Sequence, residues 1–300
     1  MDTRSLTQFL TLADTLHFGR ASEACNVSPS TLSRSIAQLE TKLGVTLFER
    51  DNRSVLLTLE GELLQQYARE SLQHWESFHN SLLEGTRELH GEISLYCSVT
   101  ASYSFLFDVL TRFRRQHPKI RIKLHTGDPE QATARVLAGE EQVSIGAKPE
   151  RLPSGLAFKQ VAVSPLVFIA PRRDAAIDAL LKAPMRAAAW RRVPMIVPER
   201  GVVRSRLDTW FAARRASPDY AAQVAGNEAI VSMVSLGSGV GVVPRIVLDN
   251  SPLAGKVRVL SVKPALGSLA LGLFVLNKRL QNRLIRAFWA SVPETPGQGE

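Results

Sequence analysis

The chain has 300 residues, of which 45% are hydrophobic and 22% charged, which is typical of a globular protein with two or three domains. Its two cysteines, Cys25 and Cys97, lie far apart, which excludes a disulfide framework and a cysteine-based metal site. The first residues mix charges with apolar side chains, unlike a signal peptide, and the longest near-apolar run, 265–276, is too short to cross a bilayer. We therefore expect a cytoplasmic protein with no membrane partner.

The formal net charge of +9 is unevenly distributed along the chain. Residues 1–58 hold six basic and six acidic side chains, residues 59–91 hold two and six, and residues 92–300 hold 29 and 16. The basic surplus of the C-terminal part fits either a small anionic ligand or simple solubility. A DNA contact by the first 58 residues would therefore depend on individual side chains and not on total charge.

Residues 1–58 predict three short helices and a hairpin. Apolar residues recur at spacings of three and four from Leu6 to Leu16, and small residues follow over 21–25. Ser28 is a suitable N-cap for a helix with Pro29 at its first position, and Gly44 is a natural stop. The segments "VTLFER" and "VLLT" flank the polar "DNRS", which predicts two short strands around a turn.

Two helices joined by a tight turn and followed by a hairpin describe a winged helix-turn-helix. The helix that starts at Pro29 would enter the major groove with its polar first turns, whose side chains are of types that contact bases and phosphates. For Ser28 the main role is that of a helix cap. The candidate DNA-binding residues are Ser28, Pro29, Ser30, Thr31, Ser33, Arg34 and Gln38 on this helix, with Arg50 and Arg53 around the hairpin turn.

Residues 59–91 predict a long linker helix, capped by Thr58, and a hinge over 85–92. Apolar residues nearly follow a heptad repeat, which favours pairing with a second copy of the chain over packing on its own C-terminal domain. These residues are Leu64, Ala68, Leu72, Trp75, Phe78 and Leu82.

From residue 92 the pattern changes to alternating strands and helices, which is typical of a doubly wound α/β domain with parallel strands. The segment 156–171 reads as two strands, and the chain ends with a strand over 265–276, a helix, and a tail.

In such a domain, ligands bind where the carboxyl ends of strands meet helix starts. Helix capping explains Ser102 equally well, and a solvated lysine explains Lys148 equally well. The candidate effector-binding residues are Ser98, Thr100, Ala101, Ser102, Thr126 and Lys148 from the first lobe, and Gly201, Asn227 and Glu228 from the second.

No pattern typical of catalysis is present. The six histidines are scattered without an HExxH motif, and there is neither a GxSxG elbow nor a phosphate-binding P-loop. "GSGVG" at 237–241 lacks the last glycine of a dinucleotide-binding loop and follows a helix. We expect no enzymatic activity, no metal and no cofactor. A transport-type binding protein would leave the first 90 residues unexplained.

The stretch "ASEACNVSPSTLSRSIAQLETKLG", with "LFERDNRSVLLT" and "EG" after it, resembles the winged helix-turn-helix of LysR-type transcriptional regulators, with Cys25 where leucine is usual. The resemblance covers nearly the whole chain. It implies a DNA-binding domain at 1–58, a linker and dimerisation helix with hinge at 59–91, a periplasmic-binding-protein-like effector domain at 92–295, and a tail at 296–300. In the effector domain, lobe I would span about 92–162 and 266–295, and lobe II about 163–265.

Further motifs, including "CSVTASYS", "KLHTGD" and "NEAIVSMVSLGSGVGVVP", resemble a subgroup of that family that activates the gene for acetohydroxyacid isomeroreductase. This resemblance implies acetolactate and acetohydroxybutyrate as inducers, and operator DNA, RNA polymerase and a second copy of the chain as partners, with dimers paired into tetramers. The alternative is a LysR-type regulator that responds to another small organic acid and controls another pathway.

Overall fold

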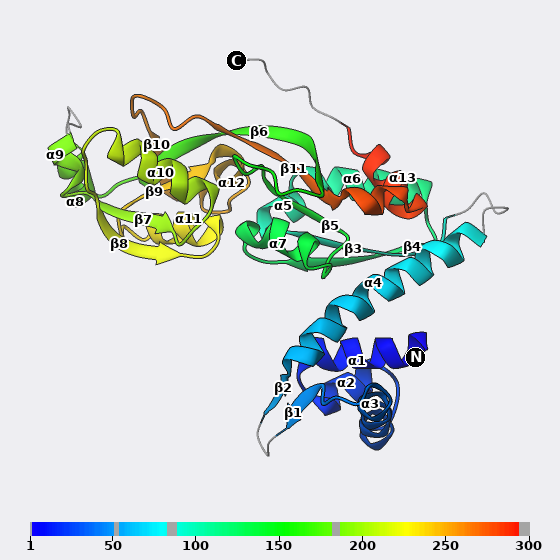
Figure 1. Cartoon of the computed structure of the whole chain (residues 1–300). Coiled ribbons are helices and arrows are strands. Elements are labelled where there is room, and N and C mark those ends of the chain that lie inside the picture. Colours follow the sequence, from blue (N-terminus) through cyan, green and yellow to red (C-terminus); the bar gives the residue numbers. More distant parts are fainter. Residues whose placement is uncertain (1, 51–53, 83–88, 182–186, 294–300) are drawn as a thin grey trace. The chain divides into compact units, whose positions relative to one another are not determined.

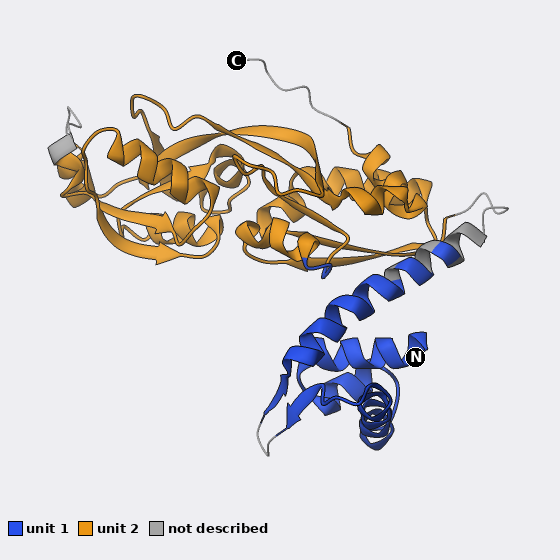
Figure 2. Cartoon of the chain, viewed as in Figure 1, with its two compact units in different colours: residues 1–87, 138–140 blue, residues 88–137, 141–300 orange. Residues whose placement is uncertain are grey.

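A computed structural model describes residues 2–50, 54–82, 89–181 and 187–293 (Figure 1). By its contacts the chain divides into two compact units, residues 1–87 with 138–140 and residues 88–137 with 141–300 (Figure 2). The predicted tail at 296–300, Arg53, and most of the predicted hinge at 85–92 lie outside the described residues. No described helix is long and apolar enough to cross a membrane.

The first unit is a helical domain with a two-stranded hairpin. Each helix starts where a side chain accepts a backbone N–H: Asp2 caps the first, His17 the second and Ser28 the third. Gly44 ends the third helix in the left-handed conformation. The elements are α1 (Thr3–Thr15), α2 (Phe18–Ala24), α3 (Pro29–Leu43), β1 (Phe48–Arg50), β2 (Val55–Leu57) and α4 (Leu59–Leu82).

The core of this unit joins α1, α3, the hairpin and the start of α4. Phe9 and Phe48 are almost fully buried, and their ring centroids lie 5.4 Å apart. Leu32 and Ile36 of α3 are buried in the same cluster. This packing fixes which face of α3 remains exposed to solvent.

The start of α4 is tied to the hairpin by Thr58 and Gly61. The Thr58 hydroxyl donates to the Thr46 carbonyl at 2.7 Å and accepts the Gly61 N–H at 3.0 Å, so Thr58 caps the helix. A Cβ on Gly61 would lie 2.2 Å from the Leu47 carbonyl oxygen. Only glycine therefore lets the helix approach the hairpin so closely.

The predicted apolar seam of α4 divides into two parts. Leu64 and Ala68 are buried against the chain's own α1, and Leu72 packs at the edge of the same cluster. Arg69 reinforces this contact by an ion pair of 2.5 Å with Asp14 on α1. The expectation that the whole seam faces a second copy is therefore wrong for its first half. Among the seam residues further along whose burial is described, Trp75 and Phe78 are exposed.

A second row of apolar side chains on α4, which shares Phe78 with the seam, is also exposed. Leu59, Leu63 and Tyr67 follow one another at spacings of four, and all three are more than half exposed. Phe78, 11 residues after Tyr67, falls on the same side of a helix with 3.6 residues per turn. This row, Leu59, Leu63, Tyr67 and Phe78, is called the α4 stripe below.

The second unit is an α/β domain whose elements follow one another in two lobes (Figure 1). Lobe I contains β3 (Gly91–Cys97), α5 (Val99–Tyr103), α6 (Phe105–Gln116), β4 (Ile120–Thr126), the 3₁₀ helix η1 (Pro129–Gln131), α7 (Ala132–Leu137), β5 (Val143–Ala147), η3 (Asn277–Gln281) and α13 (Arg283–Ser291). Lobe II contains α8 (Ala175–Leu180), α9 (Ala187–Trp190), β7 (Pro194–Pro198), α10 (Val202–Ala212), β8 (Asp219–Val224), α11 (Asn227–Ser235), β9 (Val240–Pro244), α12 (Arg245–Asp249), η2 (Ala254–Lys256) and β10 (Val257–Leu260). Two long strands, β6 (Leu156–Pro171) and β11 (Ser268–Leu276), join the lobes.

The described strands of this unit follow the order β4-β3-β5-β11-β6-β9-β7-β8, with β10 paired to β6. Within each lobe the pairs β3–β4, β3–β5, β7–β8 and β7–β9 are parallel, as predicted. The crossing strands β6 and β11 are antiparallel to each other and to their other neighbours. The expectation of two strands in 156–171 is wrong, because one 16-residue strand passes without a break from one lobe to the other.

Each lobe has its own hydrophobic core. In lobe I, Phe113 of α6 and Phe288 of α13 meet edge to face at 5.0 Å. In lobe II, Trp190, Trp210 and Phe168 cluster at 5.2 to 5.6 Å between ring centroids. Because the lobes have separate cores and are joined by two strands, the crevice between them is the expected place for a ligand.

Candidate nucleic-acid interface and ligand pocket

The start of α3 presents a cluster of exposed polar groups. The Ser28 hydroxyl accepts the Thr31 N–H at 3.2 Å and lies 3.0 Å from the Ser30 hydroxyl and 2.8 Å from the Thr31 hydroxyl. All three residues and Pro29 are exposed. The first turn of the helix therefore presents hydroxyl groups to solvent, where phosphate or base edges could accept them.

Further along α3, the buried and exposed sides are cleanly separated. Leu32, Ile36 and Leu39 are buried, whereas Arg34 and Gln38 are exposed and Ser33 is partly buried. Ser35 anchors the helix from its flank, because its hydroxyl donates to the buried Gln8 of α1 at 2.5 Å. Arg34 and Gln38 are thus exposed on the side of α3 that faces away from the core.

Arg50, a predicted DNA contact, has partners within the domain. Its guanidinium donates to the Glu40 carboxylate at 2.9 Å and lies 5.1 Å above the Phe18 ring. The other oxygen of Glu40 accepts the N–H groups of Leu47 at 2.9 Å and Phe48 at 3.3 Å. Arg50 therefore helps Glu40 to hold the hairpin against α3, a structural role that sequence reasoning missed.

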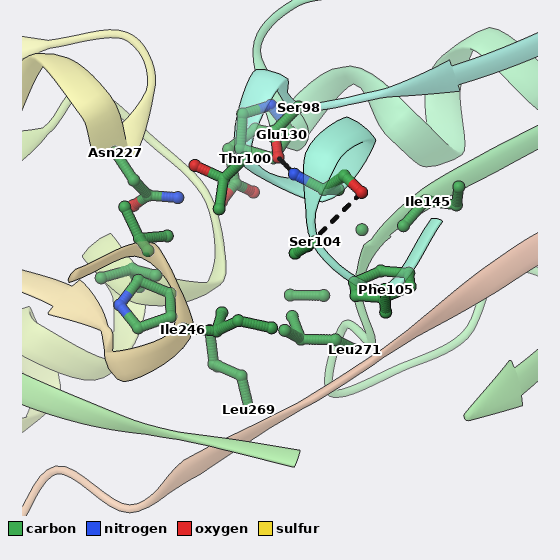
Figure 3. A pocket seen from close by; sticks show the side chains of 17 residues that line it. Ser98, Thr100, Ser104, Phe105, Glu130, Ile145, Asn227, Ile246, Leu269 and Leu271 are labelled. Carbon is green, nitrogen blue, oxygen red and sulfur yellow. Dashed lines mark hydrogen bonds between the residues drawn. The ribbon is translucent and has the colours of Figure 1, made fainter. Parts of the chain in front are cut away.

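A cavity, partly open to solvent, lies between the lobes of the second unit. Figure 3 shows Thr100, Ser104 and Phe105 of lobe I on one side, with Asn227 and Ile246 of lobe II opposite. Apolar side chains form much of its wall, namely Phe105, Ile145, Val203, Ile246, Val247, Leu269 and Leu271. Such a mostly apolar cavity with a few convergent polar groups is typical of a small-molecule site.

Four predicted effector-binding residues line this cavity, namely Ser98, Thr100, Ala101 and Asn227. Ser98, Thr100 and Ala101 lie at the start of α5, where the Ser98 hydroxyl caps the helix by accepting the Ala101 N–H at 3.2 Å. Asn227 is the first residue of α11 on the facing lobe, so the two helix starts bring these residues to one cavity. Glu228, also predicted, lies one residue further and contacts Thr100. Its Oε1 accepts the Thr100 N–H at 2.9 Å and the Thr100 hydroxyl at 2.5 Å.

The other four predicted effector residues do not line the cavity. The Ser102 hydroxyl donates to the Val99 carbonyl at 2.6 Å, which is a local helix contact, and Thr126 is exposed at the end of β4. Lys148 is exposed, with its ammonium 5.5 Å from the Phe158 ring, because side chains alternate along a strand and Ala147 faces the cavity. Gly201 lies beside the cavity and packs against the carboxyl group of Glu130.

Sequence reasoning missed two polar residues of the cavity, Ser104 and Glu130, and Glu130 is the one with a charged group. It lies in η1, and its Oε2 accepts the Val202 N–H of lobe II at 3.3 Å. Burial raises the pKa of Glu130 to about 7, the Val202 N–H and the Arg200 guanidinium oppose this rise, and the neighbouring Asp128 adds to it. A usable signal was present in the sequence, because "GDPE" follows a predicted strand at its carboxyl end.

No lysine or arginine is among the described residues that line the cavity. Its polar groups are the hydroxyls of Ser98, Thr100 and Ser104, the Asn227 amide and the Glu130 carboxyl. An anion would therefore be held by hydroxyl and N–H donors, which can bind a carboxylate without a cation. Among the described residues no cluster of three or more metal-ligating side chains is present.

Comparisons with known proteins agree with this architecture. Residues 3–62 match the family of bacterial regulatory helix-turn-helix proteins of the LysR type, and residues 86–296 match the LysR substrate binding domain. The transcriptional activator IlvY of Salmonella typhimurium is 42% identical over 302 residues, which cover 98% of this chain and 100% of the relative. The regulator IlvY of Escherichia coli is also 42% identical, over 98% of this chain and 99% of the relative.

Solved structures share the fold. A full-length variant of OxyR from Pseudomonas aeruginosa matches with a TM-score of 0.69 at 23% identity and covers 100% of this chain and 99% of its own. CbnR in complex with its target DNA matches with a TM-score of 0.64 at 21% identity and covers 97% and 99%. The relatives above are named as transcriptional regulators, which confirms the expectation that the chain is not an enzyme. The chain therefore belongs to the LysR family and is a DNA-binding transcriptional regulator.

Proposed function

We propose that this regulator activates the gene for acetohydroxyacid isomeroreductase in branched-chain amino acid biosynthesis, and that 2-acetolactate or 2-acetohydroxybutyrate induces it. The observation that carries the proposal is the cavity between the lobes, combined with an identity of 42% to activators named IlvY over the full chain. The regulator would act in the cytoplasm, bound to its operator.

The shape and chemistry of the cavity support a small branched hydroxy acid. Acetolactate carries a carboxylate, a tertiary hydroxyl, a ketone and two methyl groups. The hydroxyls of Ser98 and Thr100 and the Asn227 amide offer donors for its oxygens, and Ile246 and Leu271 offer apolar surface for its methyl groups. The additional methylene of acetohydroxybutyrate would lie against the same apolar wall. No cofactor is part of the proposal.

For operator DNA, the proposed contacts are those of the exposed α3 surface. Arg34 and Gln38 would read base edges in the major groove, while Ser28, Pro29, Ser30, Thr31 and Ser33 would lie along the adjoining phosphates. Arg53 would reach the backbone from the hairpin turn. Because residues 1–58 carry no net charge, the loss of one such cation should weaken binding strongly.

The proposed self-association uses the α4 stripe. Its four exposed apolar side chains span nearly the whole helix, which favours a parallel or antiparallel partner helix from a second copy. Two dimers would form a tetramer that holds several recognition helices on an inverted-repeat operator. Effector binding would change the arrangement of the assembly and allow RNA polymerase to engage, provided that the effector prefers one arrangement.

A thermal-shift screen tests the proposed effector. The purified full chain is heated with 2-acetolactate, 2-acetohydroxybutyrate, or valine, leucine and isoleucine. A ligand at 100 times its Kd should stabilise the folded protein by about 2.7 kcal/mol. We expect the two acetohydroxy acids to raise the melting temperature and the amino acids to leave it unchanged.

The alternative is a different small organic acid and another pathway. A broader panel of short hydroxy and keto acids in the same assay separates the two possibilities. A shift with one of these acids, and none with either acetohydroxy acid, would refute the proposed effector and leave the LysR-type regulator unaffected.

A further inference from the structure

Two glutamates cross the crevice between the lobes in opposite directions. Glu228 on α11 of lobe II reaches Thr100 on α5 of lobe I, where one oxygen accepts both the N–H at 2.9 Å and the hydroxyl at 2.5 Å. Thr100 is only 2% exposed, so these two donors lie in a region largely closed to water. The contact therefore links two lobes that are otherwise joined chiefly by β6 and β11.

Glu130 makes the reciprocal contact from lobe I to lobe II. Its carboxylate accepts the Val202 N–H at 3.3 Å, next to Gly201. A Cβ on Gly201 would lie 1.8 Å from the Glu130 carboxyl carbon, so the glutamate occupies the space that any side chain there would need. Beside it, Arg200 of lobe II donates to Asp128 of lobe I at 3.3 Å. The crevice is thus bridged by a glutamate from each lobe.

Thr100 has one backbone N–H and one hydroxyl hydrogen, and Glu228 accepts both of them. An incoming carboxylate that binds at Thr100 would need the same two donors. No cation is among the described residues that line the cavity to balance two carboxylates side by side. Two carboxylates that share the donors of one residue repel each other when no cation lies beside them. The Glu228 carboxylate and the effector's carboxylate therefore cannot occupy Thr100 together.

We propose that Glu228 is an internal competitor of the effector: in the ligand-free protein its carboxylate holds the lobes together at Thr100, and the effector's carboxylate must displace it. This inference rests on the proposed function in so far as the effector is a small carboxylic acid bound in this cavity. Glu228 is then a positioning residue that sets the effector concentration at which the regulator responds.

The consequence for affinity follows from the populations of the two states. When only a fraction of the molecules has a vacant Thr100, the apparent Kd equals the intrinsic Kd divided by that fraction. Removing the Glu228 carboxylate raises the vacant fraction. We expect Glu228→Ala to lower the apparent Kd for 2-acetolactate about tenfold, which corresponds to about 1.4 kcal/mol.

The first arm of the experiment measures the contact between the lobes without any ligand. Amide hydrogen exchange is followed in the full-length wild type and in Glu228→Ala, at the Val202 N–H in particular. Glu228 does not touch Val202, but Val202 is protected by Glu130 only while the lobes are together. We expect exchange at Val202 to be faster in Glu228→Ala. Glu199→Ala is the matched control, because it removes an exposed carboxylate from the same crevice.

The second arm measures 2-acetolactate binding by titration calorimetry in the same three proteins. A lower Kd in Glu228→Ala with an unchanged Kd in Glu199→Ala supports the competition. An unchanged or higher Kd in Glu228→Ala would overturn it, since the carboxylate would then be neutral or a direct ligand contact. Should the wild type fail to bind 2-acetolactate, the proposed effector fails, and the exchange arm still decides whether Glu228 holds the lobes together. Unchanged exchange at Val202 refutes that role.

Discussion

The β1–β2 hairpin of the DNA-binding domain is held by the side chain of Glu40, and substituting Glu40 tests how much this side chain stabilises the domain. Its carboxylate accepts the N–H groups of Leu47 and Phe48 and the guanidinium of Arg50. Leu47 and Phe48 are each only 1% exposed, so their N–H groups would find no water after the loss of Glu40. We therefore expect Glu40→Ala to destabilise the hairpin and the core beneath it.

Two interactions contribute to the free energy that Glu40→Ala would lose, namely the hydrogen bonds to the backbone and the ion pair with Arg50. Hydrogen bonds to a charged group contribute about 1.5–3 kcal/mol each, and an exposed ion pair about 0.2–1 kcal/mol. Glu40→Gln keeps an acceptor for the two backbone groups but loses the pair with Arg50, whose side chain is 34% exposed. We expect about 3 kcal/mol for Glu40→Ala and less than about 1 kcal/mol for Glu40→Gln.

Native-state hydrogen exchange at buried amides of α1 and α3 in the full chain measures these costs, because each unit of a two-unit protein can unfold separately. A loss of about 3 kcal/mol should accelerate exchange about a hundredfold, since 1.4 kcal/mol is a factor of ten. Glu49→Ala is the control and should have no effect, because Glu49 is an exposed glutamate on β1, the strand whose Phe48 N–H group Glu40 accepts. Equal acceleration in Glu40→Ala and Glu40→Gln would refute the role assigned to the two backbone hydrogen bonds.

The remaining predictions concern the two sites and the α4 stripe. Arg34→Ala should abolish operator binding in a gel-shift assay and leave the thermal shift with 2-acetolactate intact; normal operator affinity would contradict the proposed contact. Thr100→Val should keep operator binding and lose induction in a reporter assay, and a wild-type response to 2-acetolactate would exclude Thr100 from the site. Burial raises the pKa of Glu130 from 4.5 in the unfolded chain to about 7 in the folded protein. As the pH rises, the unfolded chain therefore loses this proton before the folded protein does. The free energy of unfolding falls between about pH 4.5 and pH 7, and above pH 7 it no longer depends on this group. Relative to the wild type, Glu130→Gln should therefore gain melting temperature at pH 7.5 but not at pH 4.5, and an equal difference at both values would refute the raised pKa. Tyr67→Glu, on the α4 stripe, should shift the sedimentation of the protein toward the monomer, and an unchanged profile would place self-association elsewhere.

Local structure in the first unit was readable from the sequence. Ser28 caps α3, Gly44 ends it and Thr58 caps α4, as the spacing of these residues predicted. These features involve groups three or four residues apart, so a short stretch of chain contains both partners of each hydrogen bond. The pattern of buried leucines and isoleucines on α3 follows from the same local periodicity, and it leaves Arg34 and Gln38 exposed.

The sequence did not show which element covers each apolar face, or where a strand passes from one lobe to the other. The apolar residues of α4 predict a buried seam, but only the fold shows that α1 covers Leu64 and Ala68 while the α4 stripe stays exposed. Similarly, a run of apolar residues over 156–171 does not reveal that β6 crosses both lobes without a turn, because a strand and its continuation have the same alternation.

By itself the sequence determined the boundaries of α3, the start of α4 and the type of protein, because these depend on local hydrogen bonds and on a long, specific motif. The tertiary structure alone decided which polar groups meet in the cavity. Thr100 and Glu228 are separated by 128 residues, and Glu130 and Val202 by 72, so their contacts exist only after two strands have brought the lobes together. Burial in that crevice, and not the type of residue, makes Glu130 a group that titrates near pH 7.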